Sequence, residues 1–301
     1  MLNIAHRGAR SAAPENTLEA IAKAGQLGAD AVEIDVQLGA DGVAIVFHDD
    51  DLLRCTDAAG RFPRRRPWRV SDFTAAELST LDAGAWFAAQ LISSPAERQP
   101  WLRDLSAGER DTLMQPKDMA HFASGSVRIP SLAECLRLCR KLSLVAHVEL
   151  KAIPRFYPRL ADKAVAAIRD AGMERDVLVS SFDHQALARM AQLAPGVKLG
   201  VLTRDRIHRP SEYLARLGAC AYIPCCTGED DTIGFGAVTG QIDRDTIAEV
   251  KAAGFDVYVW TENDTDRMRR LVEAGVSGIY TDYPHRLRAV LGAGIPGRHG
   301  T

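Results

Sequence analysis

The sequence predicts an α/β fold, a (β/α)8 TIM barrel with a small cap region inserted after the second barrel strand. Short apolar, β-branched runs alternate with amphipathic helical stretches, and eight such runs fit within about 250 residues, the usual length of a barrel. A doubly wound open sheet is the alternative. That fold calls for a glycine-rich fingerprint after its first strand, and residues 6–10 (HRGAR) do not supply one.

The predicted elements follow one another in the order that a barrel requires. Helix-period patterns separate the strand candidates. Asn16 precedes the first helix as an expected N-cap, and Glu19, three residues later, would complete a capping box. We expect strands at residues 2–5, 31–36, 144–150, 177–181, 198–202, 219–223, 256–260 and 278–281, and helices at 17–27, 131–141, 157–171, 184–193, 210–217, 243–253 and 264–274.

Two segments interrupt this alternation. Residues 39–42 predict a turn, followed by a strand at 43–47 that would pair with the second barrel strand. Residues 57–128 show no clear strand, and some seventy residues is too long for an ordinary loop, so we interpret this segment as the cap.

Within the cap, the sequence predicts short helices at 75–81 and 102–114. Trp68, Trp86, Phe87 and Trp101 would form either a small core of the cap or a lid over the substrate. The barrel domain with this insertion would span residues 1–291. Residues 292–301, rich in glycine and polar residues, predict a flexible tail.

Composition excludes several classes of protein. The 301 residues carry a net charge of −2 and a pI near 6.5, which argues against a nucleic-acid partner. No apolar run approaches the ~18 residues of a membrane span, and a motif begins as early as His6. We therefore expect a cytoplasmic protein without stable membrane insertion and with reduced cysteines, either a monomer or a homodimer.

Three acidic residues predict a metal site. Glu33 and Asp35 lie two positions apart on a strand and point to one side, roughly 6.6 Å apart along the backbone. Glu149 ends the third barrel strand, and in a closed barrel it would meet them at the carboxyl rim. Three oxygen ligands with open positions suit one divalent cation, Mg²⁺ or Ca²⁺. The alternative is salt bridging with lysine or arginine.

Two histidines are expected at the same rim. His6 ends the first strand. A turn centred between residues 40 and 41 would place His48 opposite Glu33, whereas a turn at positions 41 and 42 would place it opposite Asp35. Imidazoles titrate near neutral pH, so the pair would supply a general acid and a general base.

Further residues predict substrate contacts. Arg7 and Lys151 would hold phosphate oxygens, although each could instead form a rim salt bridge. Phe182 and Trp260 would wall the pocket, with core packing an equally good interpretation. His147 shares the side-chain parity of Glu149 and is expected one layer deeper, hydrogen-bonded rather than bound to metal.

Taken together, the motifs resemble the glycerophosphodiester phosphodiesterases, with the bacterial cytosolic type as the nearest match. The resemblance spans nearly the whole chain. It is carried by AHRG with PENT (5–17), VEIDV (32–36), DG-x5-HDDDLLRCT (41–56), LDAGAWF (81–87), IPSLAE (129–134), VELK (148–151), SSF (180–182), VWTEN (259–263) and YTDYP (280–284).

This resemblance implies a barrel with a small cap, and hydrolysis of a small-molecule glycerophosphodiester to glycerol 3-phosphate and an alcohol. It implies a divalent metal at Glu33, Asp35 and Glu149, with His6 and His48 as the acid–base pair. Three departures bear on the substrate's alcohol, and one is that residues 92–128 are longer than the usual cap segment. Cys55 stands where the family usually has threonine, and Glu262 where an apolar residue is common.

The same motifs allow other functions. A lysophospholipase D-like enzyme, a non-catalytic phosphate-ester sensor and an inactive scaffold could each use the same barrel. Within the enzyme hypothesis, His48 is favoured as the leaving-group acid and His6 as the base. The nucleophile is either water or the substrate's own glycerol hydroxyl, which would first give a cyclic phosphate.

Overall fold

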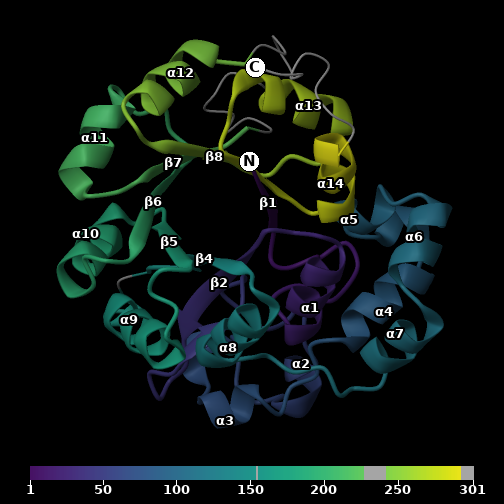
Figure 1. The fold of residues 1–301 in the computed structure, drawn as a ribbon. Coiled ribbons are helices and arrows are strands. Elements are labelled where there is room, and N and C mark those ends of the chain that lie inside the picture. Colours follow the sequence, from purple (N-terminus) through teal and green to yellow (C-terminus); the bar gives the residue numbers. More distant parts are fainter. Residues whose placement is uncertain (154, 227–241, 293–301) are drawn as a thin grey trace.

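Eight parallel strands close into a barrel in the computed structural model, which describes residues 1–153, 155–226 and 242–292. Closure is direct, because β1 pairs with β2 on one side and with β9 on the other. The TIM barrel predicted from the sequence is thus confirmed (Figure 1). Its strands are β1 (Leu2–Ala5), β2 (Ala31–Leu38), β4 (Val145–Leu150), β5 (Val177–Ser181), β6 (Lys198–Thr203), β7 (Ala221–Pro224), β8 (Asp256–Val259) and β9 (Gly278–Thr281).

A ring of helices surrounds these strands (Figure 1). The seven expected helices are present with ends shifted by at most three residues, and an eighth, α14, was not anticipated. They are α1 (Leu18–Gln26), α8 (Leu132–Leu142), α9 (Leu160–Ala171), α10 (His184–Leu193), α11 (Pro210–Leu217), α12 (Arg244–Ala252), α13 (Thr265–Ala274) and α14 (Pro284–Gly292).

The barrel has two apolar layers. Inside it, Ile4, Leu178, Ile223 and Tyr280 belong to one buried cluster. A larger cluster fills the space between strands and helices and continues into the insert. The interior of the barrel is therefore a packed core rather than a pore.

The short strand β3 (Ala44–Val46) pairs antiparallel with β2, in a register that differs from both expected ones. Val36 pairs with Val46. The reason is the loop: Gly39 and Val43 face each other through a 2.9 Å hydrogen bond, so residues 40–42 form a three-residue turn. Extending this register would put His48 opposite Ile34 rather than Glu33 or Asp35. The strand ends at Val46, however, and His48 belongs to the segment that follows.

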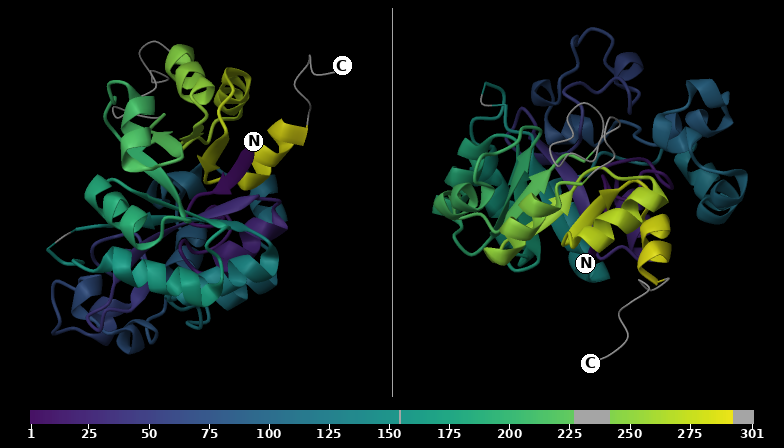
Figure 2. Two further views of the ribbon diagram at one scale, coloured as in Figure 1. Left: turned by 60° about the vertical axis from the view of Figure 1, so that its left-hand side comes forward. Right: turned by 90° about the horizontal axis from the view of Figure 1, so that it is seen from above.

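The insert between β3 and α8 is built of short helices. The helix expected at 75–81 is the shorter α3, and the one expected at 102–114 is divided into α5 and α6. Figures 1 and 2 show these helices outside the barrel's own ring, with α5 and α6 beside α14. The segments are α2 (Ala58–Arg61), η1 (Val70–Asp72), α3 (Ala75–Leu78), α4 (Ala85–Ile92), η2 (Pro95–Glu97), α5 (Pro100–Arg103), α6 (Ala107–Leu113) and α7 (Pro116–Phe122).

The aromatic residues of the insert differ in what they contact. Phe87 is fully buried and meets Phe122 edge to face, with ring centroids 5.5 Å apart. Trp101 instead faces the barrel: its ring lies 3.9 Å from the Arg10 guanidinium carbon, and its carbonyl accepts a hydrogen bond from Tyr283. The buried aromatic residues of the insert thus belong to the large apolar cluster, and Trp101 contacts the barrel rim. The tail expected at 292–301 lies almost entirely outside the described residues.

Candidate active site

The polar residues singled out from the sequence meet at the carboxyl ends of the barrel strands. His6, Arg7, Glu33, His48 and Glu149 all line one cavity of about 240 Å³, together with Lys151, Phe182 and Trp260. Asp35 is 1% exposed and in register with Glu149, and its carboxylate oxygens lie 3.5 Å from Lys151 and 3.6 Å from Arg7, which line the cavity. Every site residue predicted from the sequence therefore lies in or against a single cavity.

The acidic cluster is as expected from the strand register. Glu33, Asp35 and Glu149 each offer a carboxylate oxygen, and these atoms lie within 4.8 Å of one another. Burial, together with repulsion from Asp35 and Glu149, raises the pKa of Glu33 well above its usual range. Burial also raises the pKa of Glu149. Burial alone would raise the pKa of Asp35, but the positive charge of Lys151 holds it well below its usual range.

This cluster suits a divalent cation. The Oε1 atom of Glu33 is buried without a hydrogen-bond partner among the described residues, although Oε2 accepts one from the Arg7 backbone at 2.8 Å. A buried carboxylate oxygen without a partner costs free energy, and three converging carboxylates repel one another. A hard cation bound by oxygen ligands would remove both costs.

Two cationic side chains flank the carboxylates. The Lys151 Nζ lies 3.0 Å from Glu149 Oε1 and 3.5 Å from Asp35 Oδ1. Arg7 donates to Glu15 at 2.9 Å, and its Nε lies 3.6 Å from Asp35 Oδ2. Both form the rim salt bridges that were the alternative to phosphate binding, yet both also line the cavity. Their remaining donors are available to an anionic ligand there.

His6 is fixed by a carboxylate that sequence reasoning did not assign. Its Nδ1 lies 2.8 Å from Asp282 Oδ1, while its Nε2 lies 4.0 Å from Glu33 Oε2. Burial, with the nearby charge of Arg10, lowers the pKa of His6 to about 4. Asp282 itself is held by Arg10 through two hydrogen bonds of 2.5 and 2.8 Å and by Asn263 at 2.7 Å.

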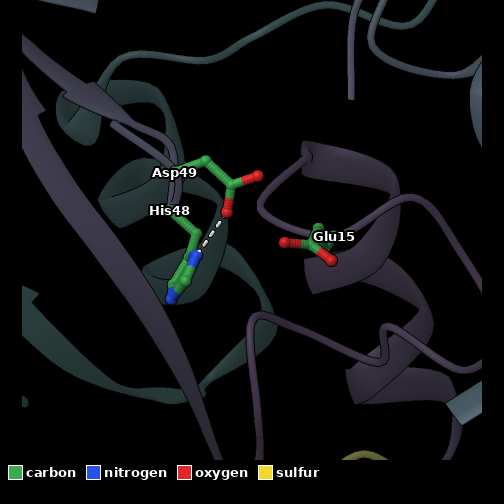
Figure 3. A group of neighbouring side chains, drawn as sticks. All are labelled: Glu15, His48 and Asp49. Carbon is green, nitrogen blue, oxygen red and sulfur yellow. Dashed lines mark hydrogen bonds and ion pairs between the residues drawn. The ribbon is translucent and has the colours of Figure 1, made fainter. Parts of the chain in front are cut away.

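His48 is held by a second network. Its Nδ1 lies 2.6 Å from Asp49 Oδ1 (Figure 3). Arg54 joins Asp49 to Glu15, with its Nε 2.6 Å from Asp49 and its terminal nitrogens 2.7 and 3.0 Å from Glu15. Figure 3 shows the Glu15 carboxylate facing the His48–Asp49 pair.

Glu15, His48 and Asp49 form a second group of possible metal ligands, whose ligand atoms lie within 4.8 Å of one another. Burial would raise the pKa of Glu15, but Arg7 and Arg54 lower it to about 2. Since arginine already compensates both carboxylates, this group fits orientation of His48 better than metal binding.

The predicted capping role of Asn16 is wrong. Thr17 is the N-cap of α1, since its hydroxyl accepts from the Ala20 amide at 3.2 Å. Asn16 has a φ of +58° and points back to β2, where its side chain donates to Asp35 at 2.8 Å and accepts from the Asp35 amide at 3.2 Å. The residue therefore orients a carboxylate of the acidic cluster rather than starting a helix.

His147 occupies the deeper layer that its parity predicted. It is 1% exposed, pairs in register with Glu33, and its Nδ1 lies 2.7 Å from the Tyr280 hydroxyl. Burial lowers its pKa to about 3. His147 thus supports the floor of the cavity as a neutral, hydrogen-bonded group.

The opposite wall of the cavity is aromatic. Phe182 and Trp260 meet nearly edge to face, with ring centroids 5.5 Å apart. Arg204, which the sequence did not single out, lines the same wall. A larger hollow of about 780 Å³ adjoins the cavity at Arg10 and Thr261. Glu262 lines this hollow, where Arg267 pairs with it at 2.8 Å.

Several site residues escaped sequence reasoning because they act through other residues. Asp282 and Asn263 lie in the YTDYP and VWTEN motifs, and Glu15 and Arg54 in PENT and HDDDLLRCT, so the motifs contained them. Only the closed barrel shows that the ends of β1 and β9 lie side by side and that Asp282 meets His6. Arg10 carried no signal in the sequence beyond its place near His6.

Comparisons with known proteins agree with this geometry. The sequence model of the glycerophosphoryl diester phosphodiesterase family matches residues 6–286. The chain belongs to this family. A glycerophosphodiester phosphodiesterase of Bacillus altitudinis is 31% identical over 283 residues, 94% of each chain. One of Caldanaerobacter subterraneus subsp. tengcongensis is 30% identical over 286 residues, 95% of this chain and 96% of the relative.

Solved structures of similar proteins show the same fold. A phosphodiesterase of Oleispira antarctica, in complex with the product sn-glycerol-3-phosphate, aligns with a TM-score of 0.71 and 25% identity over 96% of each chain. A glycerophosphodiester phosphodiesterase of Agrobacterium tumefaciens aligns with a TM-score of 0.67 and 25% identity, over 95% of this chain and 98% of that one. Among the described residues, no helix has the length and apolarity needed to cross a membrane.

Proposed function

We propose that this protein hydrolyses glycerophosphodiesters to glycerol 3-phosphate and an alcohol, with a divalent cation, Mg²⁺ or Ca²⁺, held by Glu33, Asp35 and Glu149. The observation that carries the proposal is that two histidines, Arg7 and Lys151 line one cavity of a family member, in which Glu33 and Glu149 meet the adjoining Asp35. The names of the relatives and the product complex of the Oleispira protein support the choice of substrate.

The proposed roles follow from where each side chain lies. When bound, the cation supplies Lewis acidity to a non-bridging phosphate oxygen. Arg7 and Lys151 hold the phosphate oxygens, because both carry charge-assisted donors into the cavity. Phe182 and Trp260 exclude water from the opposite side and contact the organic part of the substrate.

The two histidines divide the proton transfers. Asp282 accepts from Nδ1 of His6, which leaves Nε2 as an acceptor on the cavity side, so we assign His6 as the general base. His6 takes a proton from water or from the substrate's glycerol hydroxyl as the new P–O bond forms. His48, oriented by Asp49, protonates the departing alkoxide as the old P–O bond breaks.

The direct test is release of glycerol 3-phosphate from glycerophosphoglycerol and glycerophosphocholine, with Mg²⁺, with Ca²⁺ and after chelation. We expect His6→Ala and His48→Ala each to lower kcat roughly 10²- to 10⁴-fold, the usual contribution of a general acid or base. The matched control is His208→Ala, because His208 is exposed and lines a separate surface hollow. Full activity in both cavity variants, or in chelated enzyme, would refute the proposal.

A further inference from the structure

A buried glutamine holds the stretch of backbone that carries His48. Gln37 lies two positions after Asp35 on β2, so its side chain is on the same side of the strand, and it is fully buried. Its Nε2 donates to the carbonyls of Phe47, His48 and Asp49 at 2.9, 3.1 and 2.8 Å. An amide has two N–H bonds, so the three carbonyls share two hydrogens. One side chain therefore fixes three consecutive residues after β3.

The end of β3 explains why these carbonyls need a donor. The register of β2 and β3 would place Phe47 opposite Asp35, and the Phe47 amide does donate to the Asp35 carbonyl at 2.9 Å. The Asp35 amide, however, donates to Asn16 Oδ1 at 3.2 Å. Among the described residues, no backbone amide donates to the carbonyls of residues 47–49. Gln37 therefore supplies the donors that a neighbouring strand does not.

The other end of the same amide is held by a tyrosine. The Tyr157 hydroxyl, also buried, donates to Oε1 of Gln37 at 2.6 Å. Backbone carbonyls only accept hydrogen bonds, so Nε2 must face them and Oε1 must face the hydroxyl. Burial raises the pKa of Tyr157 above its usual range, which keeps the hydroxyl protonated as a donor. The orientation of the Gln37 amide is thus fixed from both ends.

This contact differs from the one that orients the imidazole. Asp49 meets the ring of His48, whereas Gln37 holds the main chain on either side of it. A general acid must lie within hydrogen-bond reach of the atom that it protonates. A displacement of about 1 Å, caused by a residue outside the chemistry, can lower the rate roughly 10²-fold.

We propose that Gln37 is a positioning residue for His48, which holds the backbone of residues 47–49 so that the imidazole reaches the leaving oxygen of the substrate. Tyr157 keeps the Gln37 amide in the orientation that this requires. The inference rests on the proposed function, because it concerns His48 as the acid that protonates the departing alkoxide.

The test compares two diesters that both release glycerol 3-phosphate but differ in the leaving group. Glycerophosphoglycerol releases an alkoxide that needs a proton. The p-nitrophenyl ester of glycerol 3-phosphate releases p-nitrophenolate, a weak base that leaves without one. We expect Gln37→Met to lower kcat for the first diester by up to roughly 10²-fold, with KM nearly unchanged, and to lower it for the second less than about threefold. His48→Ala should show the same selectivity.

Two further variants examine the route of the effect. Tyr157→Phe keeps the donors of Gln37 and removes one hydrogen bond, so it should lower kcat for glycerophosphoglycerol by only roughly two- to tenfold. In a double variant, adding Gln37→Met to His48→Ala should cause no further loss, because the glutamine acts through the histidine.

The chain offers a matched control for each substitution. Gln90→Met changes an amide of α4 that accepts from the Gln99 amide at 2.7 Å, within the insert. Tyr213→Phe removes a hydroxyl of α11 that lies 2.7 Å from Nδ1 of His184 in α10. Neither residue lines the cavity, so both variants should keep the wild-type kcat for both diesters.

An equal loss for both diesters in Gln37→Met, while His48→Ala distinguishes them, would show a merely structural role and overturn the inference. A further loss in the double variant would overturn it as well. If circular dichroism shows that Gln37→Met does not fold, Tyr157→Phe decides, and wild-type kcat or an equal loss for both diesters would then contradict the inference. A wild-type enzyme that releases glycerol 3-phosphate from neither diester would instead refute the proposed function, on which the inference rests.

Discussion

Two neighbouring residues after β1 adopt positive φ angles, +54° at Arg7 and +75° at Gly8. A Cβ at position 8 would lie 2.6 Å from the Ala20 Cβ and 2.7 Å from the Ala20 backbone carbon. Neither atom can move without shifting α1. Gly8 also donates its amide to the Glu33 carbonyl at 3.1 Å. This glycine therefore lets the chain cross α1 closely enough to place His6 and Arg7 at the cavity.

We expect Gly8→Ala to lower the free energy of unfolding by roughly 2–4 kcal/mol, because it combines a strained backbone with overpacking against a helix. Activity should fall as well, since the residues before it would shift. Urea unfolding and glycerol 3-phosphate release measure the two effects. The matched control is Gly108→Ala in α6, where nothing lies within 4 Å of the added Cβ, and stability there should stay the same or rise slightly. Equal stabilities of the two variants would contradict this account.

Single residues were predictable from the sequence where a short-range pattern positions them. The spacing of Glu33 and Asp35 follows from the period of two in a strand, and both lie at the acidic cluster. Asp282 was not predictable in this way, because it meets His6 across 276 positions of sequence. The sequence did not decide which residue caps α1, because Asn16 and the next residue, Thr17, are both of types preferred at the N-cap.

At the scale of elements, Glu109 joins the insert to the barrel. It caps α6 by accepting from the Ser106 amide at 2.9 Å, and it accepts from Arg286 of α14 at 2.6 and 2.9 Å. The Nε2 of His285 lies 3.0 Å away. The hydrogen bonds from Arg286 hold the pKa of Glu109 well below its usual range, and burial lowers the pKa of His285.

This contact should make stability depend on pH in the acidic range. A carboxyl whose pKa is lower in the folded state stabilises the protein above its unfolded pKa, near 4.3, and loses that contribution as pH falls. The loss begins near the unfolded pKa and continues toward the lower folded pKa, so we expect the melting temperature to drop between about pH 5 and about pH 2 by less in Glu109→Gln than in the wild type. Glu97→Gln is the matched control, because the hydrogen bonds that Glu97 accepts from Ser94 lie within the insert and do not join it to the barrel. Equal pH profiles for Glu109→Gln and the wild type would argue against the contact.

Elements were predictable where length and periodicity act together. Helices α10 and α11 begin and end at the expected residues, and the strands of the barrel differ from the expected bounds by at most two positions. The insert was harder, because its helices are as short as four residues and carry little periodicity. Within the insert, the capping boxes at Thr74–Glu77 and Ser106–Glu109 are patterns that the sequence does show.

At the scale of the whole molecule, closure of the barrel concentrates like charges. The register that pairs Asp35 with Glu149 brings acidic residues from strands far apart in sequence to one buried point. The alternation of strands and helices predicted this closure, and the strand parity predicted the acidic cluster. The position of His48 was predicted only approximately. The turn between β2 and β3 differs from both expected turns, and this changes the register of β3 against β2.

The acidic cluster should make the stability of the folded protein depend on metal binding. Without a cation the cluster opposes folding, because Glu33 is buried among like charges with one oxygen atom unpartnered. Glu33→Gln removes one charge, and its side-chain oxygen can still accept from the Arg7 amide. We therefore expect this variant to unfold at a higher temperature than the wild type in chelator, because the like-charge repulsion at Glu33 is relieved.

In Mg²⁺ or Ca²⁺ the order should reverse. A cation at a hundred times its Kd stabilises the wild type by about 2.7 kcal/mol, and the variant should lose most of this gain because it lacks one ligand. Differential scanning fluorimetry with and without metal measures both effects. The matched control, Glu273→Gln on the exposed face of α13, should show the full stabilisation by metal. A Glu33→Gln variant that is less stable in chelator and equally stabilised by metal would mean that the cation binds elsewhere.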